Sequence, residues 1–304
     1  MKLGAFILTF ERPGDLERSV LALRAQTRPP DFILIVDNAS SSETEQIARR
    51  LDDGRLGYDA TGANLGSAGG TAWGNRRLAE LGYDLIYTGD DDNPPRTPDT
   101  IARIVHLIKT CGADGAGAVG TRWDWRTGRV LRFDSSELRG SMDVDVIGGN
   151  QNLILRREVV EAGGIPDERL FFGYPDVEHC LRLRRSGYRL LIDGGLMLEY
   201  RRLAGRLAHL LRRSPIPSRR RADLWRNYYT TRNYIFMMRR RFDRPDLARR
   251  EAIRALARSV ASVTRGPGYF LDSTHYHGLG ILDGYRARLG ATIRPRPKVG
   301  VPAR

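Results

Sequence analysis

The sequence predicts an α/β protein with a mostly parallel central sheet and a basic helical appendage. Short, almost continuously apolar runs alternate with helix-like segments over residues 1–120, as in parallel sheets that helices cover on both faces. The composition then changes, because residues 201–260 contain 18 arginines, no lysine and four acids. The net charge of +14 belongs to this segment, since bases and acids balance elsewhere in the 304 residues. We expect an α/β domain at residues 1–200, an arginine-rich helical region at 201–293 and a flexible tail at 294–304.

The first 120 residues set out the sheet and its helices one after another. Pro13 favours a helix start, and Ser42 with Glu45 has the spacing of a capping box. We expect strands at residues 3–10, 32–36, 84–88 and 115–121, and helices at 13–26, 41–51, 68–81 and 97–111.

Residues 122–149 consist of short runs interrupted by polar residues, which we expect to form hairpins or loops over a site. Strand and helix patterns return after this segment. We expect strands at 150–156, 188–193 and 196–200, and helices at 157–162 and 176–186.

Three adjacent carboxylates, Asp90, Asp91 and Asp92, end the strand expected at residues 84–88 and precede two prolines. Like charges side by side repel one another, and a divalent cation with hard oxygen ligands removes that conflict. A metal at the carboxyl end of a strand in an α/β sheet is well placed to meet a nucleotide diphosphate. The alternative is a solvated acidic turn. The triplet therefore indicates a site for Mg²⁺ or Mn²⁺.

Polar or glycine-rich segments follow each of the first four strand patterns, at the sheet edge where open α/β proteins bind ligands. Asp37 can accept hydrogen bonds from a base or a ribose. Gly66, Gly69 and Gly70 either let the backbone approach a ligand closely or simply make turns. The four segments are Thr9-Phe10-Glu11-Arg12, Asp37-Asn38, Asn64-Leu65-Gly66 and Asp90–Asp92.

A second cluster surrounds Pro175, which fits the first turn of a helix and is followed by Asp176 and Glu178. Acidic residues are common in a first turn, where they interact favourably with the helix dipole, so these carboxylates have an ordinary structural explanation. The preceding residues Phe171 and Phe172 favour function instead, because aromatic rings can shield a carboxylate from water and suit it to general-base catalysis.

Taken together, these motifs resemble a family 2 inverting glycosyltransferase with the GT-A fold, the fold of nucleotide-diphospho-sugar transferases. The similarity covers roughly residues 3–200 and is nearest to the rhamnosyltransferase-like and galactofuranosyltransferase-like branch. The segments that carry it are ILTFERP, ILIVDNASS, NLGSAGG, YTGDDDNPP, GGNQNLILRREVVEAGGI and FFGYPDVEHCLRLRRSGYRL.

The resemblance implies a role for each matching residue. Asp176, the aspartate of the Asp-Val-Glu motif, would be the catalytic base, and Asp90 and Asp92 would hold the Mn²⁺ or Mg²⁺ that bridges the diphosphate. We expect contacts to the sugar or acceptor from Trp123, Gly149, Asn150 and Glu178, although a core position is the other explanation of the tryptophan. The nucleotide would be held by Thr9, Phe10, Glu11, Arg12, Asp37, Asn64, Gly66, Asp90 and Asp91.

The implied reaction is a single displacement in which Asp176 takes the proton of an acceptor hydroxyl. The favoured donor is dTDP-rhamnose or UDP-galactofuranose, with a UDP-hexose or UDP-N-acetylhexosamine as the alternative. The implied acceptor is a glycan or a polyprenyl-linked chain in cell-envelope polysaccharide synthesis. The sequence leaves the oligomeric state open.

Two positions depart from the family pattern. Glu11 replaces the asparagine of the Thr-Tyr-Asn-Arg segment of many relatives, and Tyr200 stands where relatives often have a metal-binding histidine. The third protein ligand of the metal is therefore open, and Glu199 or His209 could take its place.

The arginine-rich region predicts association with an anionic membrane surface. In residues 225–241, arginines flank aromatic and methionine side chains, as in a helix that lies on such a membrane. In the following helix Ile253, Leu256, Val260 and Val263 share one face, which we expect to pack in the core. A solvated charged face, an oligomer contact and arginine enrichment from a GC-rich genome are the alternatives.

Basic charge among aromatic residues also describes nucleic-acid binding, a different class of function. We expect no nucleic acid as partner, because no recognised nucleic-acid module is present and the carboxylates at the sheet edge would repel phosphate. No apolar stretch approaches the roughly 20 residues of a spanning helix. Cys111 and Cys180 fit neither a disulfide framework nor a zinc pattern. We expect a cytoplasmic protein that associates peripherally with the inner face of the plasma membrane.

Overall fold

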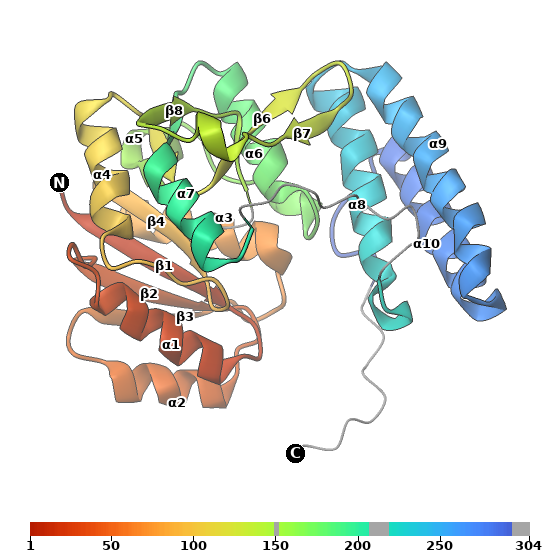
Figure 1. Cartoon of the computed structure of the whole chain (residues 1–304). Coiled ribbons are helices and arrows are strands. Elements are labelled where there is room, and N and C mark those ends of the chain that lie inside the picture. Colours follow the sequence, from red (N-terminus) through yellow and green to blue (C-terminus); the bar gives the residue numbers. More distant parts are fainter. Residues whose placement is uncertain (149–151, 207–218, 294–304) are drawn as a thin grey trace. The chain divides into compact units, whose positions relative to one another are not determined.

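The chain forms two compact units, described here from a computed structural model (Figure 1). The structure describes residues 1–148, 152–206 and 219–293, so the tail expected at residues 294–304 lies outside the described residues. The chain leaves the first unit for a short stretch just before Pro175 and then returns to it. The first unit comprises Met1–Glu168 and Pro175–His209, and the second comprises Arg169–Tyr174 and Leu210–Arg304.

An eight-stranded, mostly parallel sheet forms the centre of the first unit, as predicted. In spatial order its strands are β3 (Leu56–Ala60), β2 (Phe32–Asp37), β1 (Leu3–Thr9), β4 (Leu85–Asp90), β10 (Leu153–Arg156), β5 (Gly115–Gly117), β11 (Leu190–Asp193) and β8 (Ser141–Asp143). Strand β10 runs antiparallel to β4 and β5, and β8 runs antiparallel to β11. The other neighbouring strands are parallel.

A smaller sheet contains most of the strands in the segment expected to form hairpins. Its order is β7 (Arg129–Leu131), β6 (Gly120–Asp124) and β9 (Val146–Ile147), and both pairings are antiparallel. A 3-10 turn, η1 (Ser135–Glu137), precedes β8, and a second one, η2 (Glu168–Leu170), precedes the return to the first unit.

Helices cover both faces of the large sheet. The side chains of a strand point alternately to the two faces, so an apolar strand such as β1 packs against helices on both sides. Leu3, Ala5 and Ile7 of β1 belong to one core cluster with residues of α1, α2, α4 and α7. Phe6 and Leu8 face α3 on the other side. The helices of this unit are α1 (Pro13–Arg24), α2 (Ser42–Leu51), α3 (Gly66–Glu80), α4 (Thr100–Thr110), α5 (Arg157–Glu161), α6 (Pro175–Arg185) and α7 (Gly194–Leu203).

Glycines in α3 let the helix lie close to β1. A Cβ on Gly74 would lie 2.4 Å from the Phe6 ring, and one on Gly70 would lie 2.4 Å from Leu8. Such distances are not possible between real atoms, so only glycine permits this approach. Close packing against the sheet, rather than approach to a ligand, therefore explains Gly70.

Residues 196–200, expected to form a strand, are instead part of α7. The Asp193 carboxylate accepts a hydrogen bond from the Leu196 backbone N–H at 3.0 Å and so caps the helix start. Leu196, Met197 and Tyr200 are buried at helical spacing. An apolar run of five residues is too short to distinguish a strand from a helix by its periodicity. The Asp193 cap favours the helix here.

The second unit is helical. Gly280 and Gly284 of α10 let this helix approach α8, because a Cβ at either position would lie 2.7 to 2.8 Å from a backbone oxygen of α8. The helices are α8 (Trp225–Phe236), α9 (Pro245–Ala261) and α10 (Pro267–Arg286), with short helical turns at η3 (Arg221–Asp223), η4 (Met237–Arg241) and η5 (Ser262–Arg265). Figure 1 shows α8, α9 and α10 in its blue part.

Two expectations for the arginine-rich region are wrong. The aromatic and methionine side chains of residues 225–241, expected at a membrane surface, are mostly buried. The stripe expected to pack in the core is exposed instead, with Ile253, Leu256, Val260 and Val263 between 53% and 67% exposed. Helical spacing shows which residues share one face of a helix, but it does not show whether a neighbouring helix packs against that face.

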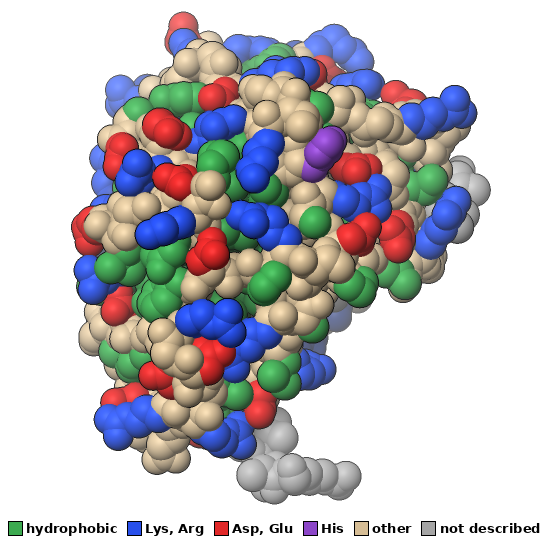
Figure 2. All heavy atoms as spheres, turned by 90° about the vertical axis from the view of Figure 1, so that its left-hand side faces the viewer, with side chains coloured by type: hydrophobic (Ala, Val, Ile, Leu, Met, Phe, Trp, Pro, Cys, Tyr) green, Lys and Arg blue, Asp and Glu red, His purple; other side chains and the backbone are tan. Residues whose placement is uncertain are grey.

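No helix in the described part of the chain is both long and apolar enough to cross a membrane. The face drawn in Figure 2 carries acidic and basic side chains interspersed, without a large area of one sign. This mixture agrees with the balance of bases and acids outside residues 201–260.

Candidate active site

The carboxyl ends of three adjacent parallel strands meet at one edge of the large sheet. Thr9 at the end of β1 is in register with Asp37 at the end of β2, and Leu8 is in register with Asp90 at the end of β4. The polar segments that follow these strands therefore share the edge at which open α/β sheets bind ligands.

Asp91, the middle residue of the acidic triplet, points into the protein. It is only 5% exposed, and its carboxylate accepts hydrogen bonds from Thr9 Oγ1 at 2.8 Å and from Arg12 Nη1 at 3.4 Å. Ser19 Oγ of α1 donates to the Asp91 backbone carbonyl at 2.7 Å. Burial raises the pKa of the Asp91 carboxyl above its ordinary value, and the Thr9 hydrogen bond opposes that shift. Asp91 thus anchors the triplet to β1 and α1, and its contact with a nucleotide stays a prediction.

Asp92 faces solvent, with 52% of its side chain exposed, and forms an ion pair with Arg12. The same guanidinium reaches Asp91 at 3.4 Å. One arginine therefore relieves the repulsion between two of the three carboxylates. Arg12, predicted to contact the nucleotide, lies beside the predicted metal ligand.

Asp90 and Asp92 offer the carboxylate oxygens that Mg²⁺ and Mn²⁺ prefer. Across the described residues, no group of three or more His, Cys, Asp or Glu side chains could hold a metal ion. Mg²⁺ is often held by one or two carboxylates, while water and substrate phosphates complete its octahedron. That Asp90 and Asp92 hold a cation together with a phosphate ligand therefore stays a prediction.

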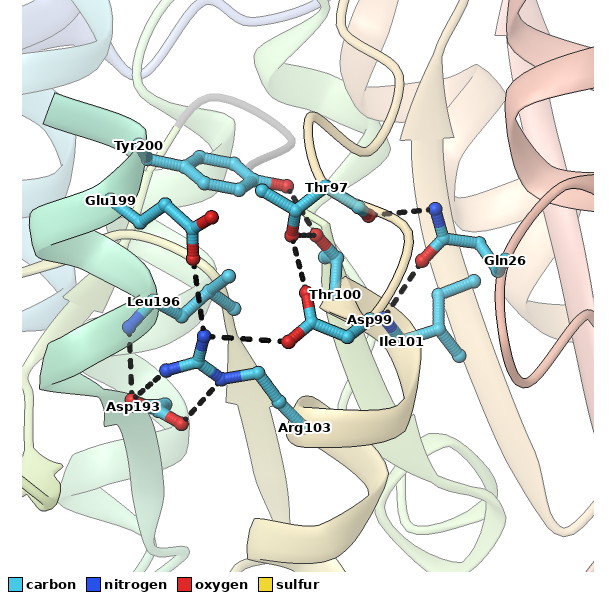
Figure 3. A network of polar contacts seen from close by, with 10 residues as sticks. All are labelled: Gln26, Thr97, Asp99, Thr100, Ile101, Arg103, Asp193, Leu196, Glu199 and Tyr200. Atoms are coloured by element: carbon cyan, nitrogen blue, oxygen red, sulfur yellow. Dashed lines mark hydrogen bonds and ion pairs between the residues drawn. The ribbon is translucent and has the colours of Figure 1, made fainter. Parts of the chain in front are cut away.

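Tyr200, at the position of the family's histidine, is buried and tied to the segment that follows the triplet (Figure 3). Its hydroxyl accepts a hydrogen bond from the Arg96 backbone N–H at 2.9 Å and lies 2.9 Å from Thr100 Oγ1. It donates to Asn152 Oδ1 at 2.9 Å, and the Asn152 amide donates to the Tyr87 hydroxyl at 2.7 Å. The tyrosine therefore joins α7 to β4, α4 and the start of β10.

Glu199, the first alternative metal ligand, is engaged by an arginine. Arg103 Nη1 lies 3.3 Å from a Glu199 oxygen, and the guanidinium also donates to both oxygens of Asp193 at 2.8 and 2.9 Å (Figure 3). A role of Glu199 at a metal stays a prediction. His209, the second alternative, lies outside the described residues.

Asp37 is fully buried, and its carboxylate organises the loop after β2. It accepts hydrogen bonds from the backbone N–H groups of Ala39 at 2.9 Å and Ser41 at 2.7 Å, and from the Tyr58 hydroxyl at 2.9 Å. Burial, followed by the hydrogen bond to Asp37, raises the pKa of Tyr58 well above its ordinary value. The carboxylate therefore shapes this loop, and its contact with a nucleotide stays a prediction.

Asn38, which the sequence analysis placed at the sheet edge without giving it a role, holds the loop that contains Asn64 and Gly66. Its side-chain oxygen accepts from the Leu65 backbone N–H at 2.9 Å, and its amide donates to the Gly66 carbonyl at 3.0 Å. The Asn64 oxygen in turn accepts from the Gly66 backbone N–H at 2.9 Å. A polar residue at a strand end, directly after Asp37, was the sequence signal that could have identified Asn38.

Phe10 and Glu11 lie just beyond β1 at the same sheet edge. Phe10 is 40% exposed, although it is a large aromatic residue, so its ring is accessible to a planar ligand. Glu11 has φ = 54°, in the left-handed region that asparagine adopts more readily than glutamate. The asparagine of the family pattern would suit this backbone better.

Helix α6 begins at Pro175 and has Asp176 and Glu178 in its first turn, as predicted. Glu178 is fully buried, and its oxygens accept hydrogen bonds from Arg182 at 2.9 and 3.3 Å. His179 bonds the Gly164 carbonyl, and burial lowers the pKa of its imidazole to about 4, so the ring is neutral at pH 7. These contacts fix α6, and a sugar contact from Glu178 stays a prediction.

The Asp176 carboxylate lies beside the loop that follows β9. A Cβ on Gly148 would lie 3.7 Å from Asp176 Oδ2, so this oxygen lies close to the backbone of the loop at Gly148. The next residues, Gly149 and Asn150, were predicted to contact the sugar or acceptor and lie outside the described residues.

Two further expectations concern aromatic residues. Trp123 in β6 is buried and lies edge-on to Trp125, with ring centroids 6.1 Å apart, as expected for a core tryptophan. Phe171 and Phe172, expected to shield the Asp176 carboxylate, belong to the second unit, where their rings lie 5.2 Å from those of Tyr229 and Trp225.

Residues 5–156 match the model of the family described as glycosyl transferase family 2. Over 200 residues the chain is 30% identical to galactofuranosyltransferase GlfT1 of Mycobacterium tuberculosis, an alignment that covers 60% of this chain and 64% of that protein. Galactofuranosyltransferase GlfT1 of Mycolicibacterium smegmatis is 31% identical over 200 residues, with 60% and 65% covered. The chain thus matches less than two thirds of the length of these relatives.

The solved structure of the mannosyltransferase PcManGT from Pyrobaculum calidifontis, in complex with GDP-Man and Mn²⁺, superposes on the chain with a TM-score of 0.56. The match covers 94% of this chain and 88% of that one at 16% sequence identity. The two proteins share their fold, the GT-A fold.

Proposed function

Because the chain belongs to glycosyl transferase family 2, we propose that it transfers a sugar from a nucleotide-diphosphate donor to a hydroxyl group of a glycan or lipid-linked acceptor. The observation that carries the proposal is the meeting of Thr9, Arg12, Asp91 and Asp92 at the carboxyl edge of the sheet. This edge also offers the exposed ring of Phe10. Asp90 and Asp92 supply carboxylates of the kind that bind a divalent cation, and the Arg12 guanidinium lies beside Asp92.

The residues at this edge would bind the donor as follows. The exposed ring of Phe10 would stack on the base, and the loop at Asn64 and Gly66 would lie along the nucleotide. Asp90 and Asp92 would hold Mn²⁺ or Mg²⁺ against the diphosphate. When bound, this cation neutralises the negative charge that develops on the departing nucleotide diphosphate.

Asp176 would act as the base of a single displacement. The acceptor oxygen bonds to the anomeric carbon from one side while the bond from that carbon to the diphosphate oxygen breaks on the other, which inverts the configuration. The acceptor's proton passes to the Asp176 carboxylate. The position of this carboxylate beside the Gly148 loop supports the assignment, since that loop continues into the segment predicted to contact sugar or acceptor.

Among donors we propose UDP-galactofuranose first and dTDP-rhamnose second. The first choice is supported by the two relatives named as galactofuranosyltransferases. PcManGT was solved with GDP-Man and Mn²⁺, which supports a divalent cation and a nucleotide-sugar as donor for this fold. We also propose a role in cell-envelope polysaccharide synthesis, which the resemblance of the sequence motifs implies.

The proposal is tested by thermal shift with UDP, dTDP and GDP, each with and without Mn²⁺, followed by transfer assays with the matching nucleotide-sugar. We expect UDP or dTDP to raise the melting temperature only when Mn²⁺ is present, and Asp92→Ala to abolish that shift. In Asp176→Ala the shift should persist while acceptor-dependent release of nucleotide diphosphate falls by about 10³-fold or more. A metal-dependent shift that survives Asp92→Ala would refute the metal assignment, and full transfer by Asp176→Ala would refute the base.

We further propose that α9 binds the surface of an anionic membrane, where a lipid-linked acceptor would lie. The exposed residues Ile253, Leu256 and Val260 of α9, continued by Val263 in η5, provide the apolar face. Exposed arginines bracket it, with Arg249 and Arg250 before the stripe and Arg265 after it. An apolar stripe alone would also suit a protein partner, but the excess of arginine favours negatively charged lipid head groups.

The expected binding free energies indicate that both the apolar residues and the flanking arginines contribute to membrane binding. Each inserted aliphatic side chain contributes about 1.5 to 3 kcal/mol at full burial, and each arginine near an anionic leaflet about 1 kcal/mol. Sedimentation with vesicles of phosphatidylcholine, with or without phosphatidylglycerol, separates the two contributions. We expect capture only by the anionic vesicles, loss of capture in Val260→Ser, and no effect of Leu21→Ser, an exposed leucine on α1. Equal capture by both kinds of vesicle, or a stable dimer that Val260→Ser dissociates, would refute the membrane proposal.

A further inference from the structure

Asp92, the exposed aspartate of the triplet, lies between two residues that are tied to the core of the first unit. On one side Asp91 is buried, and Thr9 Oγ1 donates to its carboxylate at 2.8 Å. On the other side the backbone carbonyl of Asn93 accepts a hydrogen bond from Asn152 Nδ2 at 3.3 Å. The backbone at Asp92 is therefore held from both directions, while its side chain is 52% exposed.

Asn152 is buried, and each end of its side-chain amide has a partner. Nδ2 donates to the Tyr87 hydroxyl at 2.7 Å as well as to the Asn93 carbonyl, and Oδ1 accepts from the Tyr200 hydroxyl at 2.9 Å. The orientation of the amide follows from the Asn93 carbonyl, which can only accept and must face the nitrogen. One side chain of the first unit thus joins β4, the residue after the triplet, and α7.

The backbone at Asn152 also restricts which residues fit this position. It has φ = 56°, in the left-handed region, and directly precedes Leu153, which is in register with Thr88 of β4. Glycine, asparagine and aspartate adopt this conformation more readily than other residues. Of these three, only asparagine supplies a side-chain N–H donor for the carbonyl after the triplet.

Gly89 lets the Tyr87 ring lie along β4, where its hydroxyl meets Asn152. A Cβ on Gly89 would lie 2.7 Å from Tyr87 Cε1 and 3.4 Å from the hydroxyl oxygen. A side chain at this position would push the ring away, so the contact between Tyr87 and Asn152 requires a glycine here. This packing explains the glycine that directly precedes the acidic triplet.

We propose that Asn152 is a positioning residue for Asp92. By holding the Asn93 carbonyl it fixes the backbone that carries the Asp92 carboxylate, so that this carboxylate is in place before a divalent cation binds. Partners that orient a metal ligand typically contribute about 10- to 100-fold to metal affinity. The inference rests on the proposed role of Asp92 as a metal ligand.

The test uses the full chain with Asn152→Gly and Asn152→Asp. Glycine keeps the left-handed backbone and removes the side chain. Aspartate keeps the acceptor for Tyr200 but replaces the donor by an oxygen that repels the Asn93 carbonyl. Asn75→Ala is the matched control, because it removes another fully buried asparagine, whose amide bonds the Thr71 carbonyl within α3.

Three measurements separate the position of Asp92 from the stability of the protein. Electron paramagnetic resonance gives the affinity for Mn²⁺ in the presence of excess UDP or dTDP. Hydrogen exchange without metal reports on the backbone amides of residues 91–93. Urea unfolding gives the free energy of unfolding of each variant.

We expect both Asn152 variants to bind Mn²⁺ about 10- to 100-fold more weakly and to exchange faster at residues 91–93. Asn75→Ala should lower the free energy of unfolding but leave both the Mn²⁺ affinity and this exchange unchanged. If neither Asn152 variant folds, Tyr200→Phe serves instead. It removes the hydroxyl that holds Asn152 Oδ1 and should weaken Mn²⁺ binding by a smaller factor.

Three outcomes would overturn the inference: wild-type Mn²⁺ affinity in the folded variants, weaker Mn²⁺ binding with unchanged exchange at residues 91–93, or an equal loss of Mn²⁺ affinity in Asn75→Ala. Failure of the proposed function looks different. Wild-type Mn²⁺ affinity in Asp92→Ala would refute the metal assignment itself, whatever the Asn152 variants do to hydrogen exchange.

Discussion

Thr9 Oγ1 donates a hydrogen bond to Asp91 Oδ2 at 2.8 Å and joins the ends of two neighbouring strands across 82 positions of sequence. The bond turns the middle carboxylate of the triplet into the protein, and it leaves Asp92 at the surface beside Arg12. A run of three identical residues is thereby divided into a buried anchor and an exposed candidate ligand.

Thr9→Val should therefore destabilise the protein. Valine has the shape of threonine but cannot donate, so the buried Asp91 carboxylate loses a hydrogen bond, and the free energy of unfolding should fall by about 1 to 3 kcal/mol. Urea unfolding measures the change. The control is Thr127→Val, which removes a similar 2.7 Å bond to Asp124 in a surface turn and should have a smaller effect. Equal effects of the two substitutions would contradict the anchoring role of Asp91.

Glu11→Asn should stabilise the protein. Glu11 has φ = 54°, and a left-handed backbone costs most L-residues about 1 to 2 kcal/mol, less for asparagine. We expect the free energy of unfolding to rise by about 0.5 to 1 kcal/mol. Glu11→Ala keeps the strain while removing the carboxylate, so it should lack this gain. A gain of the same size in Glu11→Ala would assign the effect to charge instead.

Tyr200→Phe should weaken the core around the segment that follows the triplet. The substitution removes the hydroxyl that bonds Asn152 and the Arg96 backbone N–H, which leaves buried polar groups unsatisfied at a cost of about 1 to 3 kcal/mol. Chemical unfolding and hydrogen exchange at residues 93–100 measure the effect. Tyr188→Phe, whose hydroxyl takes no part in this network, is the control. Unchanged exchange at residues 93–100 would show that the network does not hold this segment.

His277 should make stability depend on pH in the acidic range. Burial lowers the pKa of this imidazole to about 3, and the charges of Arg258 and Arg219 add to the shift. The unfolded chain then binds more protons than the folded one between pH 3 and the ordinary value of 6.5, so stability is lost as the pH falls below 6.5.

The slope from this residue reaches about 1.4 kcal/mol per pH unit. This slope should be absent in His277→Gln, so the difference in stability between wild type and the variant, measured by urea unfolding at several pH values, should change with pH by this amount. His275→Gln, at an exposed position of the same helix, should follow the wild type. A wild-type pH profile in His277→Gln would contradict the burial of a neutral imidazole.

The order of elements in the first unit was predictable because apolar runs and helix caps are local signals. Pro13 and the polar residues after each strand were sufficient to expect parallel strands with one ligand-binding edge. The cap of α2 differs from the prediction: Ser41, whose side chain accepts a hydrogen bond from the Thr44 backbone N–H, is the N-cap instead of Ser42 in a capping box with Glu45. The antiparallel β10 between β4 and β5 was not predictable, since its partners lie far away in the sequence. Residues 196–200 formed a helix because the Asp193 cap outweighed an ambiguous apolar run.

The roles of single side chains divide in the same way. Sequence alone determined which residues follow the strands, and therefore that Thr9, Asp37 and the triplet Asp90–Asp92 belong to one edge, because parallel strands bring their carboxyl ends together. Only the tertiary structure decided that Asp91 points inward and Asp92 outward, that the stripe on α9 is exposed, and that Asn152 binds the backbone carbonyl that follows the triplet. The physical reason is that periodicity shows which residues share a face. Which face is covered, and which carbonyl meets which amide, depends on contacts between residues distant in the chain.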